Sequence, residues 1–370
     1  MSRALALLVV SLVAGCGDDP PAAVVVSARE VGFLDQSAEI QGRDGGESAR
    51  VWGHTVFAFG DTVLNVPDVE GQTWHHNSFS FTDDTDAADG IGPVVERNDA
   101  AGAPIYFIAP TADEQAFNVA HRGDPCAEMP CNARWAAWPG EPVWDAARSR
   151  ALVFYELIYA EPGDFNFHGV GRSLAVWTSF EDVPMRPEVS PGAAHPTLVW
   201  GEGERAPGIA PQVVGEELFA FECRAATLSR PCVLFSAPLA RALEHDAWRV
   251  WTGSGWSADV GDAEDLFDGA PIMSVHWNAW LGAYVAVYSK SLENDVVIRT
   301  APALTGPWSG AQTLFVANRG TASGWTYDAV AHAELSGDGG RILYVTYSQP
   351  TGETWFSARF PIVQVELARR

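Results

Sequence analysis

The chain has 370 residues and a formal net charge of −24 at pH 7. A surface this acidic repels phosphate backbones, so we expect no nucleic-acid partner; it also argues against an anionic polymer and leaves neutral ligands open. The length suits either one large repeat domain or two ordinary domains.

The N-terminal residues have the pattern of a bacterial lipoprotein signal peptide. Arg3 supplies a positive start, residues 4–13 are apolar but too few to span a bilayer, and small residues precede Cys16. We expect residues 1–15 to be removed, Cys16 to be acylated, and residues 16–24 to tether the folded domain to a membrane. The alternative is an ordinary signal peptide in which this cysteine is incidental. A lipid anchor would place the protein in the cell envelope, on its periplasmic or cell-surface side.

A short phrase of apolar residues that ends in a polar residue recurs along the chain. Its β-branched and aromatic residues are bounded by turn residues, which is typical of strands, and a repeat about every 60 residues is typical of propeller blades. The copies occupy residues 55–61, 151–156, 218–222, 284–290 and 343–349. Because no linker separates them, we predict one all-β domain over residues 25–370: a five-bladed β-propeller with four-stranded antiparallel blades and almost no helix. A strand near residues 24–26 or 31–33 should pair with residues 360–365 and close the ring.

The four cysteines beyond the leader form two pairs that are close in sequence. An oxidising compartment favours two local disulfides, which join Cys126 to Cys131 and Cys223 to Cys232. A zinc site is the alternative, but neither spacing is the short C-x-x-C that zinc sites favour. The cysteines therefore agree with export.

Hairpin geometry predicts that two aspartates of the first blade meet at one rim. We place the turn at residues 53–54, which pairs Gly46 with Asp61. Asp44 lies two residues beyond Gly46, so Asp44 and Asp61 should lie within about 5–10 Å of each other. Both have neighbouring glycines, which allow a ligand to approach the backbone closely.

Strand pairing in the other blades adds carboxylates to this rim. Asp328 is expected opposite Gln349 in the fifth blade, while Glu156 and Glu222 end the strand phrases of the second and third blades. Clustered carboxylates suit glycosidic bond cleavage, because one can stay protonated as an acid while another stays charged. The alternative is that each is a solvated turn residue. The predicted catalytic residues are Asp44 and Asp61 as the pair, with Asp328 and Glu156 across from them.

Several motifs resemble the bacterial family known as domain of unknown function 4185. They are GRDGG at 42–46, WGHTVFAFGDT at 52–62, WPG at 138–140, SVHWN at 274–278, and segments at 281–285, 299–301, 306–308, 327–334 and 338–340. In this order they cover most of residues 25–365. The resemblance implies a five-bladed propeller related in shape to the furanosidase propellers. Some members are endo-D-arabinanases of glycoside hydrolase family 183 with catalytic aspartates in the first blade, which by position are Asp44 and Asp61. The insertion around Cys126 departs from the family pattern.

Other side chains near the rim are assigned to substrate binding rather than chemistry. Four of them lie within the family-like motifs, and the fifth ends the third strand phrase; they are Arg43, His276, Tyr327, His332 and Glu222. No metal or cofactor is predicted, because the acidic loop at residues 83–90 lacks EF-hand spacing and the histidines form no His-Glu-x-x-His pattern. The chain also has no nucleophile elbow, phosphate loop or dinucleotide fingerprint.

The sequence therefore predicts a monomeric, surface-tethered glycoside hydrolase that acts on a neutral polysaccharide, such as an arabinofuranose polymer. The alternative is a non-catalytic lipoprotein that binds glycan or protein with the same rim. Rim carboxylates that face an open channel mouth would favour the enzyme, whereas an aromatic groove alone would favour the binder.

Overall fold

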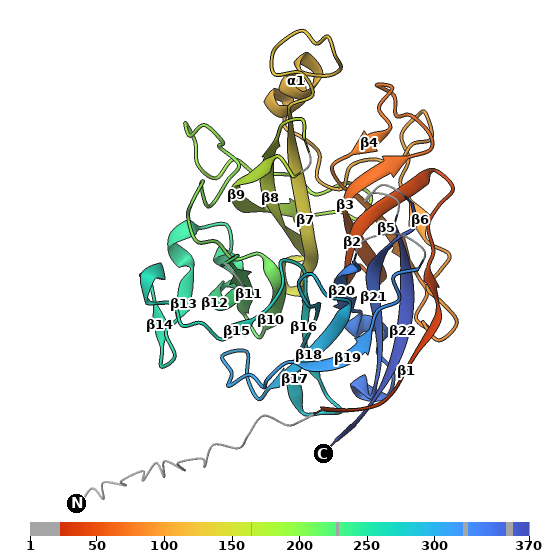
Figure 1. The fold of residues 1–370 in the computed structure, drawn as a ribbon. Coiled ribbons are helices and arrows are strands. Elements are labelled where there is room, and N and C mark those ends of the chain that lie inside the picture. The colour runs from red at the N-terminus through yellow and green to blue at the C-terminus, as the bar shows by residue number, and fades with distance from the viewer. Residues whose placement is uncertain (1–22, 164, 227–228, 321–324, 353–357, 370) are drawn as a thin grey trace, which may run out of the picture.

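The computed structural model describes residues 23–369 except residues 164, 227–228, 321–324 and 353–357. The predicted signal peptide, Cys16 and most of the predicted tether lie outside the described residues. Five antiparallel sheets form a five-bladed propeller, which confirms the predicted fold class (Figure 1). The innermost strands of the blades contact one another in cyclic order around a central channel.

The first two blades differ in strand number. Blade 1 contains β2 (Ile40–Val51), β3 (His54–Leu64), β4 (Trp74–His75), β5 (Ser78–Thr82) and β6 (Val95–Glu96). Blade 2 contains only β7 (Arg134–Asp145), β8 (Arg150–Ala160) and β9 (Phe167–Trp177). The segment beside β9 forms only isolated bridges, at Met185 and Trp200. Its prolines, among them Pro184 and Pro187, lack the N–H that a fourth strand would need, so the prediction of four strands is wrong for this blade.

The remaining blades contain six, four and four strands. Blade 3 contains β10 (Ile209–Val214), β11 (Glu217–Cys223), β12 (Pro231–Pro238), β13 (Arg249–Trp251), β14 (Trp256–Ser257) and β15 (Phe267–Asp268). Blade 4 contains β16 (Ser274–Asn278), β17 (Ala283–Ser289), β18 (Asp295–Ala301) and β19 (Gln312–Val316). Blade 5 contains β20 (Tyr327–Ala331), β21 (Ile342–Pro350), β22 (Ala358–Arg369) and β1 (Ala23–Leu34). The predicted number of four strands is therefore confirmed for blades 4 and 5, whereas blade 3 has two strands more than predicted.

The N-terminal strand closes the ring, as predicted. β1 pairs antiparallel with β22, from Ala23 opposite Arg369 to Leu34 opposite Phe360. Because the first strand of the chain completes the last blade, the edge of β22 is covered rather than exposed. The strand begins two residues before the predicted start of the domain.

Helical structure is confined to short segments. They are α1 (Ala112–Ala120) and the 3₁₀ turns η1 (Ala146–Arg148), η2 (Leu239–Arg241), η3 (His245–Ala247), η4 (Val260–Asp262), η5 (Ala333–Leu335) and η6 (Asp338–Gly340). α1 has a capping box, in which Thr111 and Glu114 satisfy each other's backbone N–H groups. No helix in the described part of the chain is long and apolar enough to cross a membrane.

The apolar core is divided among the interfaces between blades. Within the described residues, each of five large buried clusters joins two neighbouring blades. For example, Phe59 of β3 packs against Phe360 of β22 where the first and last blades meet, with ring centroids 5.4 Å apart. Neighbouring blades are thus held together by the apolar side chains that they share.

The first hairpin differs from its predicted register. Its turn lies at Trp52 and Gly53, which both have the positive φ values (47° and 86°) that a tight hairpin turn requires, so the pairing predicted for Gly46 is wrong. Two register shifts farther along β2 leave Asp44 and Gly46 bulged. These bulges offset the shifted turn and bring Asp44 beside Asp61 despite the wrong register.

Candidate active site at the channel mouth

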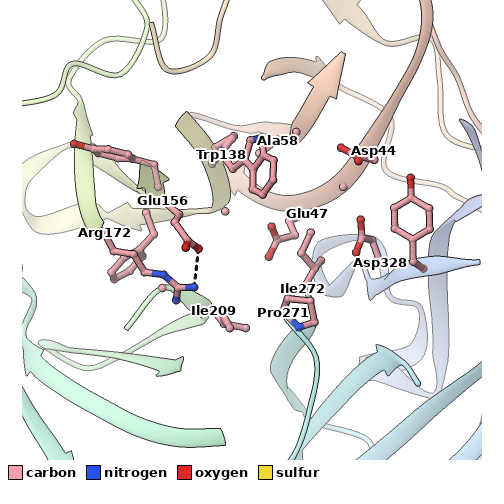
Figure 2. Close-up of a pocket in the computed structure, with 18 of the residues that line it drawn as sticks. Asp44, Glu47, Ala58, Trp138, Glu156, Arg172, Ile209, Pro271, Ile272 and Asp328 are labelled. Atoms are coloured by element: carbon pink, nitrogen blue, oxygen red, sulfur yellow. Dashed lines mark hydrogen bonds and ion pairs between the residues drawn. The ribbon is translucent and has the colours of Figure 1, made fainter. Parts of the chain in front are cut away.

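A cavity of about 430 Å³ opens at one mouth of the channel, and all five blades contribute to its lining. We call it the mouth cavity. Four carboxylates face it, those of Asp44, Glu47, Glu156 and Asp328. Figure 2 shows Asp44, Glu47 and Asp328 grouped on one side, with Glu156 and Arg172 on the other. Of the predicted catalytic residues, three therefore line one cavity.

Asp44 reaches the cavity from the bulge in β2. Its carboxylate accepts hydrogen bonds from its own backbone N–H and from that of Asp61. It lies directly over Gly60, where an added Cβ would be only 2.7 Å from Asp44 Oδ1. Burial raises the pKa of Asp44 to about 7, with the two N–H groups opposing part of the rise. Near neutral pH this carboxyl can therefore take up or release a proton.

Asp61 lies next to Asp44 but is not part of the cavity lining. Burial and the charge of Asp44 raise its pKa well above the ordinary value, while Arg134 and Trp138 oppose the rise. The structure thus brings the predicted pair together, and the two carboxyls titrate as one coupled system.

Asp328 and Tyr327 enter the cavity from blade 5. Tyr327 pairs with Ser348, and Asp328 has a left-handed backbone (φ 53°), so the predicted pairing of Asp328 with Gln349 is wrong. The Asp328 carboxylate accepts a hydrogen bond from the Gly45 backbone N–H. Burial and the nearby Asp44 charge raise its pKa well above the ordinary value, so Asp328 holds its proton to higher pH than an exposed aspartate does.

Glu47 is a cavity carboxylate that was not predicted. It is 6% exposed, and burial together with the charge of Asp328 raises its pKa to about 8. In a regular strand, residues three apart point to opposite faces, so Glu47 and Asp44 would diverge. The bulge between them turns both toward the channel, and sequence alternation alone gives no indication of it.

Glu156 differs from the other three because it has a cationic partner. Its Oε2 lies 2.8 Å from Arg172 Nη2. Gly169 on the neighbouring strand makes this placement possible, since a Cβ there would be 2.1 Å from Glu156 Oε1. Glu156 is thus held as an ion pair at the edge of the mouth cavity.

The predicted substrate-binding residues lie in different places, and only Tyr327 lines the mouth cavity. Arg43 is fully buried between Phe59, 3.5 Å from its guanidinium carbon, and Glu96, 3.3 Å away. His276 lines a separate hollow farther along the channel, and burial lowers its pKa to about 4. Glu222 is buried and forms ion pairs with Arg205 and Arg224.

His332 supports the channel wall rather than facing the mouth cavity. Its Nδ1 lies 2.6 Å from Ser48 Oγ and its Nε2 lies 2.8 Å from Thr346 Oγ1. Burial lowers its pKa to about 3, so the ring is neutral. Among the residues that the structure describes, no group of three or more His, Cys, Asp or Glu side chains is arranged to hold a metal ion.

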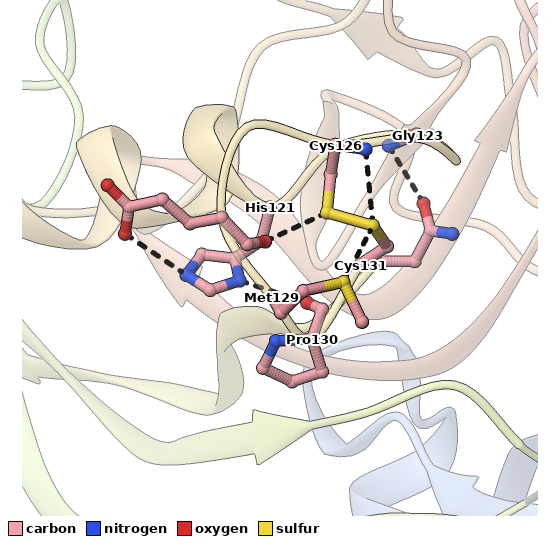
Figure 3. The surroundings of a disulfide bond; sticks show 8 residues. His121, Gly123, Cys126, Met129, Pro130 and Cys131 are labelled. Atoms are coloured by element: carbon pink, nitrogen blue, oxygen red, sulfur yellow. Dashed lines mark hydrogen bonds and ion pairs between the residues drawn. A yellow bond between two sulfur atoms is a disulfide. The ribbon is translucent and has the colours of Figure 1, made fainter.

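Both predicted disulfides are confirmed. The bond between Cys126 and Cys131 closes a loop in the insertion between blades 1 and 2, where His121 Nδ1 donates to the Pro130 carbonyl at 2.9 Å (Figure 3). The second bond joins Cys223 to Cys232, which are paired residues of β11 and β12. Disulfides are typical of proteins outside the cytoplasm.

Comparison with known proteins agrees with this fold. Residues 215–355 match the model of domain of unknown function 4185, which confirms the resemblance to that family over this part of the chain. No curated protein matches the sequence.

Solved structures also align along most of the chain. A presumed hydrolase from Bacteroides ovatus aligns with a TM-score of 0.59 and 13% identity, over 91% of this chain and 87% of its own. A thermostable family-43 glycoside hydrolase aligns with a TM-score of 0.48 and 10% identity, over 89% of each chain. A family-117 glycoside hydrolase from Zobellia galactanivorans aligns with a TM-score of 0.44 and 12% identity, over 92% of this chain and 89% of its own. The first match supports the propeller fold and carries no activity across.

Proposed function

We propose that the protein is a glycoside hydrolase that cleaves a polysaccharide in the mouth cavity. The observation that carries the proposal is the grouping of three buried carboxyls, those of Asp44, Glu47 and Asp328, on one side of a single cavity (Figure 2). The pKa of each of them is raised. Glycosidic bond cleavage requires one protonated and one ionised carboxyl, and carboxyls that lie close together do not all ionise at the same pH.

The proposed roles follow from position and protonation. Asp328 donates a proton to the leaving glycosidic oxygen, and ionised Asp44 attacks the sugar or removes a proton from the attacking water. Asp61, outside the lining, is a positioning residue that shares the proton of Asp44 and offers its backbone N–H to the Asp44 carboxylate. The pair predicted from sequence, Asp44 and Asp61, is thereby retained as the coupled centre.

The lining between the carboxylates suits a sugar. Trp138 and Phe167 line the cavity with aromatic side chains and pack edge to face with ring centroids 5.0 Å apart. Aromatic faces stack on the C–H faces of a pyranose or furanose ring, while protonated carboxyls bind its hydroxyl groups.

The substrate and setting rest on the sequence. We propose that the substrate is a polysaccharide whose sugars on either side of the cleaved bond are neutral, such as arabinofuranose. This proposal is based on the family resemblance and on the net charge of −24. We also propose that the protein is a monomer anchored through lipidated Cys16. The two disulfides support a position outside the cytoplasm.

The second candidate function is glycan binding without cleavage. It is favoured by the number of cavity carboxyls whose pKa is raised, since protonated carboxyls can hold sugar hydroxyls without doing chemistry. Both candidates predict binding, and only the first predicts new reducing ends.

The test is a screen of the protein against plant and bacterial arabinans and other neutral polysaccharides, read by released oligosaccharides. We expect one class to be cleaved and Asp44→Asn to abolish cleavage while retaining binding. Binding of a glycan by the wild-type protein with no released product would support the non-catalytic candidate instead.

A further inference from the structure

A second hollow of about 250 Å³ adjoins the mouth cavity and shares Glu156 and Arg172 with it. We call it the arginine hollow. Four glycines, at positions 169, 171, 201 and 203, contribute to its lining. A Cβ at position 171 would lie 2.3 Å from the Trp200 carbonyl oxygen, so the close approach of β9 to the Trp200 backbone depends on glycine.

All but one of the arginines that line this hollow form an ion pair with a glutamate. Glu156 pairs with Arg172 at 2.8 Å. Glu222 pairs with both Arg205 and Arg224, each at 2.7 Å. Arg230 also lines the hollow, so three arginines and three glutamates contribute to its lining, the third glutamate being Glu204. In a chain whose net charge is −24, this even balance of charge is a local departure from the acidic composition.

Arg230 is the arginine whose charge is least satisfied. Its Nη1 donates to the Cys223 carbonyl at 3.1 Å, and no ion pair is found for it within the described residues. Burial and the like charge of Arg172 lower its pKa, while the charge of Glu156 opposes part of the fall. Because Glu156 is bonded to Arg172 and acts on Arg230 without an ion pair, a further anion would satisfy Arg230, and arginine binds carboxylate and phosphate groups well.

We propose that the arginine hollow is a subsite for a sugar that carries one anionic substituent, a carboxylate or a phosphate ester. The ligand would continue from the mouth cavity past Glu156, so that Arg230 and Arg172 contact its anionic group. Exposed charges are screened within about 8 Å at physiological salt, so this local cluster can select one anion although the whole surface repels a polyanion. The inference rests on the proposed function only in taking the ligand to be a sugar.

The experiment measures binding of three small probes to the full chain by calorimetry. The probes are methyl β-D-glucuronide, D-glucose 6-phosphate and the neutral methyl β-D-glucoside. We expect at least one anionic probe to bind about tenfold more tightly than the neutral one, and Arg230→Gln to remove this preference. The better anionic probe distinguishes a carboxylate subsite from a phosphate subsite.

The matched control is Arg249→Gln, because Arg249 is an exposed arginine of the same blade whose Nη1 donates to the nearby backbone carbonyls of Asp246 and Trp248. It should keep the preference. Thermal melting of the Arg230 variant checks that it folds, and Arg224→Gln provides a second test if it does not. Equal binding of all three probes by wild type, or an unchanged preference in a folded Arg230 variant, would overturn the proposal.

The hydrolase proposal and the subsite proposal can be tested independently of each other. Asp44→Asn should lose cleavage and keep the anion preference, since Asp44 does not line the arginine hollow. An anion preference without cleavage of any glycan would support the subsite and remove the hydrolase proposal. Cleavage of neutral glycans with no anion preference would support the hydrolase proposal and remove the subsite proposal.

Discussion

The mouth cavity and the arginine hollow place the same kind of residue in opposite surroundings. In the mouth cavity, Asp44, Glu47 and Asp328 are crowded together and buried, and their pKa values are raised. In the arginine hollow, Glu222 is equally buried but has two arginine partners at 2.7 Å. A buried carboxyl without a cation keeps its proton to higher pH than usual, whereas one with a cation is held as an ion pair. Only the first kind can exchange a proton with a substrate.

The largest loss of activity is expected when a carboxyl of the mouth cavity is removed. Asp44→Asn and Asp328→Asn should each lower kcat on a cleaved glycan by about a thousandfold, because each removes a group that acts on the reacting atoms. Asp246→Asn is the matched control, since its carboxylate is 85% exposed and lies on the surface beside Arg241. Full activity in both cavity variants would exclude these carboxyls from catalysis.

Asp61 should have a smaller effect that leaves the pH profile in place. Burial is the main cause of the raised pKa of Asp44, and the charge of Asp61 is not among its causes. Asp61→Asn also keeps the backbone N–H that donates to the Asp44 carboxylate, so the acidic limb of kcat/KM should not move while kcat falls by about tenfold. A thousandfold loss in kcat would instead make Asp61 a catalytic residue.

Glu156 lies at the border between the two regions and tests how they are connected. Glu156→Gln frees Arg172 from its carboxylate partner, so an anionic probe should bind several-fold more tightly in calorimetry. Arg172→Gln should have the opposite effect on the same measurement. If Glu156→Gln leaves anion binding unchanged and abolishes cleavage, Glu156 belongs functionally to the mouth cavity alone.

The sequence predicted the fold better than it predicted the site. Repeated strand phrases and an unpaired N-terminal strand were enough for five blades and ring closure, because both depend on local pattern. Asp44 and Asp61 were correctly placed together only because the bulges at Asp44 and Gly46 offset a wrong turn. Glu47 was missed because those bulges reverse strand alternation. The arginine hollow was missed because Arg172 and Arg230 come from different blades and share no sequence spacing.

The unpaired carboxyls should also make stability depend on pH. Burial raises the pKa of Glu47 from 4.5 to about 8, so the folded protein binds this proton more tightly than the unfolded chain does. Its stabilising contribution is complete below about pH 4.5 and is lost as the pH rises toward 8. Thermal and urea unfolding should therefore show a more stable protein at pH 5 than at pH 9. Glu47→Gln should reduce this difference by a few kcal/mol, whereas the exposed Glu293→Gln should not. A steeper decline in the Glu47 variant would contradict the assignment.

The smallest effect is expected from the disulfide that lies apart from both regions. The bond between Cys126 and Cys131 closes a short loop, and neither cysteine lines the mouth cavity or the arginine hollow. A short loop restricts the unfolded chain only modestly, so replacing both cysteines by serine should lower Tm by a few degrees and change kcat by less than about twofold. Cys223, by contrast, lines the arginine hollow, and its carbonyl accepts from Arg230. Replacing Cys223 and Cys232 by serine should weaken binding of the anionic probe as well as lower Tm. If the two double variants behave alike in anion binding, the second disulfide does not position Arg230, and the hollow is held by its ion pairs and glycines alone.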